Sequence, residues 1–431
     1  MARFRIPYSR RFLDLELPDD QVAGVIESAA HHYTPEGDEQ TLVRRALENP
    51  IQSERLSELS KGKDKIVIIT SDHTRPVPSK ITLPILLEEI RSGNPNADIT
   101  ILIATGFHRL TTEAEMLDKF GEDIVKNEKL VNHDCRDDSQ LTLCGTLPSG
   151  GELWLNKLAV EADLLISEGF IEPHFFAGFS GGRKSVLPGV ASAKTVLGNH
   201  CASFIIHPNS RTGILDGNPI HIDMLYAAEQ AKLAFILNVV IDANKKIIHA
   251  VAGDSVEAHT QGCTFVEKLA SCEPVPADIV ITSNGGYPLD QNIYQTVKGM
   301  TAGEATAKKD GVIIICSACN DGHGGEAFYQ TFLNQKSTQG VMDEIMKTEM
   351  DCTVPDQWES QILARILLQF QVILMTDECD AKMVTDMHMI HASTLDEAIA
   401  KAREIKGQDA KITVIPDGVS VIVKESEPAA V

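Results

Sequence analysis

The stretch DLLISEGFIEPHFFAGFSGGRKSVLPGVASAKTVLGNH, residues 163–200, brings more chemically useful side chains together than any other part of the chain. It begins as an apolar strand and continues into a loop rich in glycine and other small residues. A loop at the carboxyl end of a parallel strand is where α/β proteins commonly bind their ligands. We therefore expect the binding site here, built around His174, Arg183, Lys184 and His200.

An apolar strand followed by a short polar loop and a helix recurs on both sides of this stretch. The pattern predicts strands over residues 65–70, 99–104, 164–166, 233–241 and 246–251. It predicts helices over residues 40–47, 79–91, 113–120 and 255–269. This alternation is typical of an α/β fold with largely parallel sheets that are covered by helices.

A segment with two prolines, residues 271–276, interrupts the alternation, which then starts afresh. Further strands are predicted over residues 278–282, 312–315 and 372–375, and helices over residues 292–301 and 359–370. We therefore predict an N-terminal α/β domain over residues 1–273, which carries the loop, and a C-terminal Rossmann-like α/β domain over residues 274–410. Residues 411–431 are expected to form a β hairpin and tail that turn at Pro416-Asp417-Gly418.

The overall charge narrows the range of partners. The chain has 431 residues, too many for one hydrophobic core, and its 39 Lys and Arg against 61 Asp and Glu give a formal net charge of −22. A chain this acidic is repelled by nucleic-acid phosphates and anionic membrane surfaces, so we expect no nucleic-acid and no membrane partner.

We expect the chain to be cytoplasmic. The first residues lack the apolar core of a secretory signal, and no run approaches the roughly 18 to 20 apolar residues that span a bilayer. Nine cysteines without a regular framework indicate reduced thiols. Cys316 and Cys319 form a C-x-x-C pair at the end of an apolar run, which we interpret as two ordinary buried cysteines, with a metal or redox role as the alternative.

Polar and charged side chains follow three of the predicted strands of the first domain. Because parallel strands end at one edge of a sheet, side chains from distant positions can converge there. In an acidic chain, a local gathering of Arg and Lys predicts a small anionic ligand, a carboxylate or a phosphate. The alternative for each side chain is a solvated position on a loop. The set is Asp72, His73, Arg75, His108, Arg109, His174, Arg183 and Lys184.

Two nucleotide-binding fingerprints are absent. Residues 178–185, GFSGGRKS, are similar to a P-loop, but Arg183 stands where the glycine before the lysine is required. No G-x-G-x-x-G motif occurs, which disfavours a nicotinamide cofactor bound in the usual way. The glycines of this run can still let backbone amides approach a phosphate.

Histidines and a polar helix complete the candidate site. Histidine suits both proton transfer near neutral pH and metal binding, and composition alone leaves open which of His108, His174 and His200 does which. In the second domain the predicted helix after residue 291 carries Tyr294, Gln295 and Lys298 on neighbouring faces, and an ordinary amphipathic helix is the alternative.

Seven parts of the chain together resemble the lactate racemases that use a nickel pincer nucleotide. They occur in one order over nearly the whole chain, and chance similarity does not extend so far. They are SDHTRPVPS (71–79), ATGFHR (104–109), ISEGFIEPHFFAGFSGGRKSVLPG (166–189), His200, NGGYPLDQNIYQTVKGMTAGEAT (284–306), DGHGGEAFY (321–329) and PDQW (355–358). The resemblance implies two α/β domains with an active-site cleft between them.

The resemblance also implies the cofactor and the role of each site residue. The cofactor would be a nickel-carrying pyridinium-3,5-bisthiocarboxylic acid mononucleotide that other proteins synthesise and that Lys184 holds covalently. His200 would bind the nickel, and His108 and His174 would be the general acid/base pair. Asp72, Arg75 and Tyr294 would surround the cofactor, and Arg75, Gln295, Lys298 and Trp358 would bind the substrate.

The implied reaction interconverts L- and D-lactate. The hydrogen on C2 would leave as hydride to the cofactor and return to the opposite face of bound pyruvate, while the two histidines move the hydroxyl proton. Two alternatives stay open at this point. One is the same chemistry on another 2-hydroxy acid, such as malate or a longer aliphatic acid, and the other is a non-catalytic protein that binds the nickel nucleotide.

Overall fold

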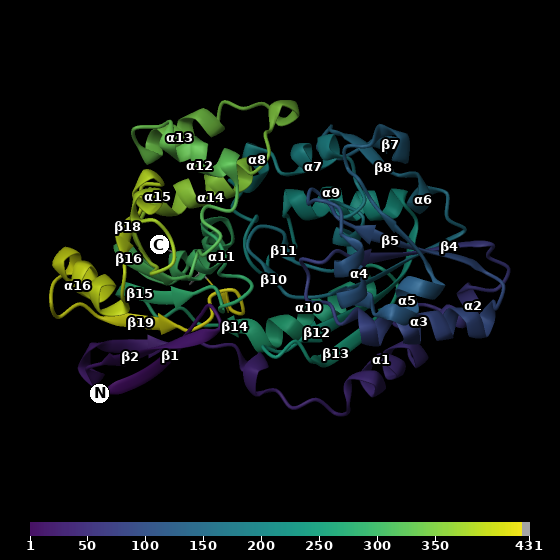
Figure 1. The fold of residues 1–431 in the computed structure, drawn as a ribbon, viewed down its shortest axis with the longest axis horizontal. Helices are drawn as coiled ribbons and strands as arrows, with labels where there is room; N and C mark the ends of the chain where they lie inside the picture. The colour runs from purple at the N-terminus through teal and green to yellow at the C-terminus, as the bar shows by residue number, and fades with distance from the viewer. Residues whose placement is uncertain (425–431) are drawn as a thin grey trace, which may run out of the picture.

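The computed structural model describes residues 1–424, which form two lobes, each built around a six-stranded sheet (Figure 1). Neighbouring strands of the two sheets pair in parallel, with one exception. Strands β13 (Ile247–Gly253) and β12 (Leu233–Ile241), at one edge of the first sheet, are antiparallel. The predicted α/β fold with largely parallel sheets is confirmed.

In spatial order the sheet of the first lobe contains β13 (Ile247–Gly253), β12 (Leu233–Ile241), β9 (Leu164–Phe170), β4 (Lys65–Ser71), β5 (Asp98–Ala104) and β6 (Lys129–Asn132). That of the second lobe contains β18 (Ile390–Ala392), β17 (Gln371–Met375), β16 (Ala307–Cys316), β15 (Ala277–Ser283), β19 (Ile412–Ile415) and β3 (Val22–Val25).

Helices accompany both sheets, and short strands form four further pairs. The first lobe contains α1 (Glu39–Glu48), α2 (Leu56–Leu59), α3 (Ser79–Gly93), α4 (Glu113–Phe120), α5 (Glu122–Asn127), α6 (Lys157–Val160), α7 (Ala193–Asn199), α8 (Ala202–Ile205), α9 (Pro219–Gln230) and α10 (Glu257–Ala270). The second contains α11 (Ile293–Glu304), α12 (Glu326–Leu333), α13 (Thr338–Ile345), α14 (Gln357–Leu367), α15 (Ala381–Asp386) and α16 (Leu395–Lys406). The short pairs are β1 (Ala2–Tyr8) with β2 (Arg11–Leu17), β7 (Leu141–Thr146) with β8 (Glu152–Asn156), β10 (Pro173–His174) with β11 (Gly178–Phe179), and β14 (Ser271–Cys272) with β20 (Ile422–Val423).

Local sequence explains where these elements begin and end. Strands β4 and β5 each contain five consecutive buried residues, as expected of strands covered on both faces. Thr112 and Glu115 form a reciprocal capping box at the start of α4. Asn218 caps α9, whose first residue is Pro219, and α16 ends at Gly407. Among residues 1–424, no helix has both the length and the apolar character needed to cross a bilayer.

One apolar core continues from the first lobe into the second. It joins residues of β4 and β9 to residues of α11 and α14. A hydrogen bond also crosses between the lobes, because the side-chain amide of Gln361 in α14 donates to the carbonyl oxygen of Ala202 in α8 at 2.8 Å. The two lobes are therefore packed against each other where α14 meets the first lobe.

The prediction that residues 1–273 form one domain is wrong for the N-terminal segment. Strand β3 pairs with β19 at the edge of the second sheet, and the β1–β2 hairpin lies against the same lobe (Figure 1). Ile6, Tyr8 and Leu15 of the hairpin are buried in the core that holds β15 and β16. The local sequence carries no sign of this pairing, because its partner strand follows almost 400 residues later.

The predicted hairpin over residues 411–423 is also wrong. Strand β19 lies between β15 and β3 as a parallel member of the second sheet, and β20 pairs in parallel with β14. The Pro416-Asp417-Gly418 turn does change the chain direction, but both strands find partners elsewhere that bury their apolar side chains. The remainder of the predicted tail, residues 425–431, lies outside the described residues.

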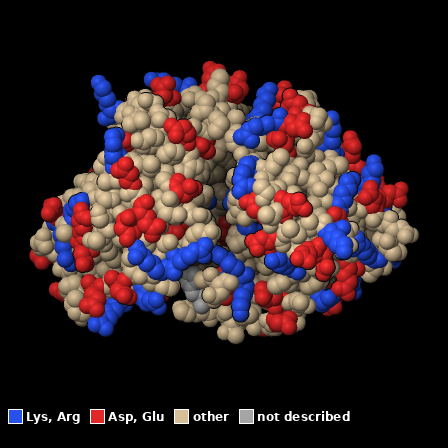
Figure 2. Space-filling view, in the orientation of Figure 1, with Lys and Arg blue, Asp and Glu red and all other residues tan. Residues whose placement is uncertain are grey.

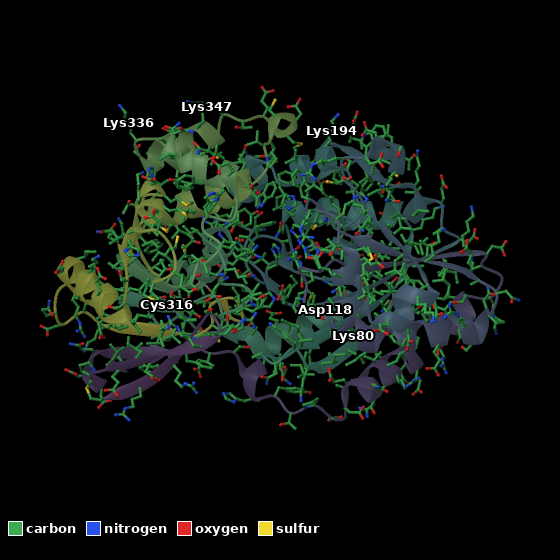
Figure 3. The ribbon with its side chains drawn as sticks, in the orientation of Figure 1. Lys80, Asp118, Lys194, Cys316, Lys336 and Lys347 are labelled. Atoms are coloured by element: carbon green, nitrogen blue, oxygen red, sulfur yellow. The ribbon has the colours of Figure 1, made fainter. Side chains whose placement is uncertain are left out.

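Cys316 and Cys319 lie in the interior of the second lobe, where Figure 3 labels Cys316. Both are free thiols with no solvent exposure. Burial raises the pKa of each thiol to about 12. Such thiols stay protonated and have the character of structural cysteines rather than of reactive thiolates.

We predict that the N-terminal hairpin contributes strongly to the stability of the second lobe. Because the Ile6 side chain is fully buried, Ile6→Ala should lower the free energy of unfolding by about 2–5 kcal/mol. Arg3→Ala, which removes an exposed ion pair between Arg3 on β1 and Glu16 on β2, should lower it by less than about 1 kcal/mol. Urea denaturation followed by circular dichroism measures both, and equal effects would contradict the assignment of the hairpin to this core.

Candidate active site

A cavity of about 210 Å³ lies between the lobes, where the space-filling view is hollowed (Figure 2). The ends of β4, β5 and β9 and the loops after them form its wall in the first lobe, and α11 and α14 form its wall in the second. All ten residues to which the family resemblance assigns a role line this one cavity. They are Asp72, Arg75, His108, His174, Lys184, His200, Tyr294, Gln295, Lys298 and Trp358.

The loop after β9 is held from behind by Arg183, whose side chain is 1% exposed. Its guanidinium group donates to the carbonyl oxygens of Ala177 at 2.8 Å and Gly181 at 3.2 Å, and to Nδ1 of His221 at 2.9 Å. Burial lowers the pKa of Arg183 to about 10, so the group remains charged near neutral pH. Gly182 has a φ of +51°, and a Cβ there would lie 2.7 Å from the imidazole ring of His259. The loop therefore requires both a buried guanidinium and a glycine.

His108 and Asp72 form a hydrogen-bonded pair at the edge of the cavity. Nδ1 of His108 lies 2.7 Å from Oδ2 of Asp72, whose side chain is 2% exposed. Burial acts to raise the pKa of Asp72, but hydrogen bonds from His108 and Thr74 and the charge of Arg75 outweigh it and lower this pKa to about 2. An ionised Asp72 requires a hydrogen on Nδ1 of His108. In the neutral ring Nε2 is then a free proton acceptor.

His174 lies deeper in the same cavity and has the opposite tautomer. The backbone N–H of Ala177 donates to Nδ1 of His174 at 3.3 Å, which leaves Nε2 as the protonated nitrogen of the neutral ring. Burial, and then the nearby charges of Lys184, Lys298 and Arg75, lower the pKa of His174 well below its ordinary value. His174 stacks on Phe175 with 5.1 Å between ring centroids, which fixes the plane of the imidazole.

Burial among cations lowers the pKa of both Lys184 and His200. Burial, followed by the charges of Arg183, Arg75 and Lys298, lowers the pKa of Lys184 well below its ordinary value. Burial and the charge of Lys184 lower the pKa of His200 to about 3. Nδ1 of His200 lies 2.9 Å from the carbonyl oxygen of Val196, to which it donates, so that Nε2 keeps its lone pair. A neutral amine is a nucleophile, and a neutral imidazole nitrogen fixed in this way is a typical metal ligand.

The second lobe contributes a cation and an aromatic wall. Nζ of Lys298 donates to Oε1 of Gln295 at 2.7 Å, three residues earlier on α11. Nε1 of Trp358 donates to the hydroxyl oxygen of Tyr294 at 2.9 Å. The ring of Trp358 also contacts that of His200, with 5.0 Å between centroids. Residues of both lobes are therefore required to complete the cavity.

Three side chains that the sequence grouped with the site do not line this cavity. Arg183 is buried behind the loop. Arg109 forms an ion pair with Glu115 on the surface, at 2.5 Å. His73 contacts the hydroxyl group of Thr111 at 3.2 Å and lines a neighbouring cavity. Each follows a strand as predicted, but the direction of the side chain, which the strand pattern does not specify, takes it away from the site.

Sequence reasoning missed several polar residues that line the cavity, among them Ser71, Ser167, Glu168 and Glu359. Glu168 accepts hydrogen bonds from Thr70 and Thr82, and its only sequence signal is an acidic residue inside an apolar strand. The hydroxyl groups of Ser71 and Ser167 are buried without a hydrogen-bond partner among the described residues. Glu359, next to Trp358, is 1% exposed and also lines the cavity. Helix α14 is buried on all sides, and an acidic residue in such a helix is the signal that could have indicated Glu359 as a site residue.

Family models match both parts of the chain. The model described as the lactate racemase N-terminal domain matches residues 8–213, and that of the lactate racemase C-terminal domain matches residues 272–423. The lactate racemase of Thermoanaerobacterium thermosaccharolyticum is 60% identical over 99% of this chain and 100% of its own length. The lactate racemase of Lactiplantibacillus plantarum is 54% identical over 98% of this chain and 100% of its own length.

Solved structures agree with these matches. The lactate racemase apoprotein from T. thermosaccharolyticum superposes with a TM-score of 0.96 at 59% identity and covers 98% of this chain and 100% of its own. A protein from Thermotoga maritima shares the fold, with a TM-score of 0.64 at 19% identity over 91% of this chain and 100% of its own. Full-length identity above half, matches to both domain models and the same fold lead to one conclusion: the chain belongs to the lactate racemase family.

Proposed function

We propose that this protein interconverts L- and D-lactate, with a nickel pincer nucleotide attached to Lys184. The observation that carries the proposal is a pair of histidines with different partners at Nδ1, the carboxylate of Asp72 for His108 and the backbone N–H of Ala177 for His174, within one cavity that also contains Arg75 and Lys298. One imidazole is prepared to accept a proton and the other to donate one, beside two cations suited to a carboxylate. Two relatives that are more than half identical bear the name lactate racemase, which supports the choice of substrate.

The residues of the cavity fit the proposed cofactor. The lowered pKa of Lys184 favours the neutral amine that a covalent link requires, and the hydrogen bond from Nδ1 of His200 to Val196 leaves its Nε2 available to nickel. The unpartnered hydroxyl groups of Ser71 and Ser167 would gain hydrogen-bond acceptors from a nucleotide. When bound, the nucleotide supplies an acceptor for the C2 hydrogen as hydride, which avoids a carbanion beside a carboxylate.

The protein's own groups bind the hydroxy acid and move its hydroxyl proton. Arg75 and Lys298 hold the carboxylate while the rest of the molecule turns to present its other face. For one enantiomer, Nε2 of His108 takes the hydroxyl proton, and His174 returns a proton to the oxygen from the other side. The bound carboxylate offsets the charges of Arg75 and Lys298, which favours the protonated form of His174 that this step needs. For the opposite enantiomer the two histidines exchange roles, which requires the other neutral tautomer of His174, with its hydrogen on Nδ1 and without the hydrogen bond from Ala177.

The direct test is to follow the optical activity of several 2-hydroxy acids. Loaded protein should convert L-lactate and D-lactate to the same racemic mixture, seen as loss of the circular dichroism signal from either side. Rapid turnover of malate or a longer aliphatic acid beside negligible turnover of lactate would favour the alternative substrate. No change with any acid, despite bound cofactor, would favour a non-catalytic binding protein.

We predict that Asp72→Asn lowers kcat in both directions by about 10²–10⁴-fold with little change in KM. The amide can donate to Nδ1 of His108 and so places the hydrogen on Nε2, which removes the proton acceptor. The control is Asp118→Asn, since Asp118 is exposed on α4 (Figure 3). Steady-state kinetics with each enantiomer measure the effect. An undiminished kcat in Asp72→Asn would refute the role of this pair.

The attachment at Lys184 predicts a change in mass. Protein from a host that makes the cofactor should carry an adduct of nucleotide size on the peptide that contains Lys184, and Lys184→Ala should carry none. Lys194→Ala, an exposed lysine on α7 labelled in Figure 3, should keep both adduct and activity. Intact and peptide mass spectrometry measure the adduct. Active protein with an unmodified Lys184 would exclude this attachment.

A further inference from the structure

Glu359 is a buried acid that the proposed reaction does not use. It lies in the first turn of α14 and lines the active-site cavity with a side chain that is 1% exposed. Neither of its carboxyl oxygens has a hydrogen-bond partner among the described residues. A buried carboxyl group without a partner is strongly unfavourable, so a compensating group is expected in the cavity.

Lys298 is the cation placed to compensate it. It lies on α11, which packs against α14, and lines the same cavity. Its ammonium group has three hydrogens, and its one hydrogen bond among the described residues goes to Gln295. Burial and the charge of Arg75 lower the pKa of Lys298, whereas the charge of Glu359 raises it. Burial raises the pKa of Glu359 above its ordinary value, and the charge of Lys298 opposes this rise and favours the carboxylate.

We propose that Glu359 is a positioning residue, whose carboxyl group holds Lys298 as an ammonium ion that faces the cavity. Without this acid, burial beside Arg75 would favour the neutral amine, which attracts a carboxylate much less. The use of that ammonium for the carboxylate of a 2-hydroxy acid rests on the proposed function. The effect of Glu359 on the charge of Lys298 is independent of the proposed function.

Other titratable groups surround this pair and must be compared with Glu359. Glu172 also raises the pKa of Lys298, but by less than Glu359 does. It lines a neighbouring cavity of about 240 Å³, and Arg75 and Lys298 line both this cavity and the active site. Asp356, near the start of α14, raises the pKa of Glu359. The remaining groups nearby are Arg75, His174, Lys184 and Tyr294.

The test measures the protonation of Lys298 directly in the full chain without cofactor. Trace acetylation by acetic anhydride at a series of pH values, quantified on the peptide that contains Lys298, gives the pH at which half of the amine is free. Glu359→Gln has nearly the same shape and should lower this midpoint by about one pH unit. Glu359→Asp, which keeps the charge, should stay closer to the wild type, and Glu172→Gln should shift it less than Glu359→Gln.

The control is Glu344→Gln, which removes an exposed charge on α13 and should leave the midpoint unchanged. An equal midpoint in Glu359→Gln and the wild type would overturn the proposal, as would an equal shift in Glu344→Gln. With loaded enzyme, the alkaline limb of kcat/KM for lactate should move to lower pH in Glu359→Gln. A shifted amine midpoint in a protein that does not racemise lactate would refute the proposed function and leave the role of Glu359 intact.

Discussion

The buried guanidinium of Arg183 is the interaction on which the site depends. Its donors bind backbone carbonyl oxygens of the loop after β9 and a neutral histidine from α9, and no carboxylate of residues 1–424 accepts a hydrogen bond from it. Such a group fixes a glycine-rich loop from behind, because a planar fork of donors can bind several carbonyl oxygens at once. Lys184 is the next residue and lines the cavity on the opposite side from this network. The loop that resembles a P-loop is therefore organised by a cation of the protein rather than by a phosphate.

Burial among cations sets the chemistry of the cavity. The same physical cause lowers the pKa of Lys184 and of His200, which favours the neutral forms that covalent attachment and metal binding require. For Asp72 the charged form is favoured instead. The hydrogen bonds from His108 and Thr74 outweigh its burial, lower its pKa and keep it ionised. A pair of histidines with different tautomers results from two different partners, a carboxylate for one and a backbone N–H for the other. The two lobes must meet to create this environment, since Lys298 and Glu359 come from the second.

Particular residues show how far sequence reasoning reached. The apolar runs of β4 and β5 predicted both strands nearly to the residue, because period and composition are local properties. Asp72 and His108 were predicted to converge because parallel strands end at one edge, and the cavity contains both. Arg109 and His73 follow the same strands, yet they point elsewhere, since the orientation of a loop side chain depends on its neighbours in space. Glu359 was missed because a charged residue in a helix is normally exposed.

The sequence by itself determined the alternation of strands and helices, the two parallel sheets and the residues that could form a site, because these depend on local periodicity and on side-chain chemistry. Only the tertiary structure decided that residues 22–25 complete the second sheet and that residues 412–415 join it as a parallel strand. Pairing between strands that are distant in the chain is governed by burial of apolar surface over the whole lobe, which no local pattern specifies. The pKa shifts of His174, Lys184, Lys298 and Glu359 arise in the same way, because burial and neighbouring charges exist only after the lobes have packed.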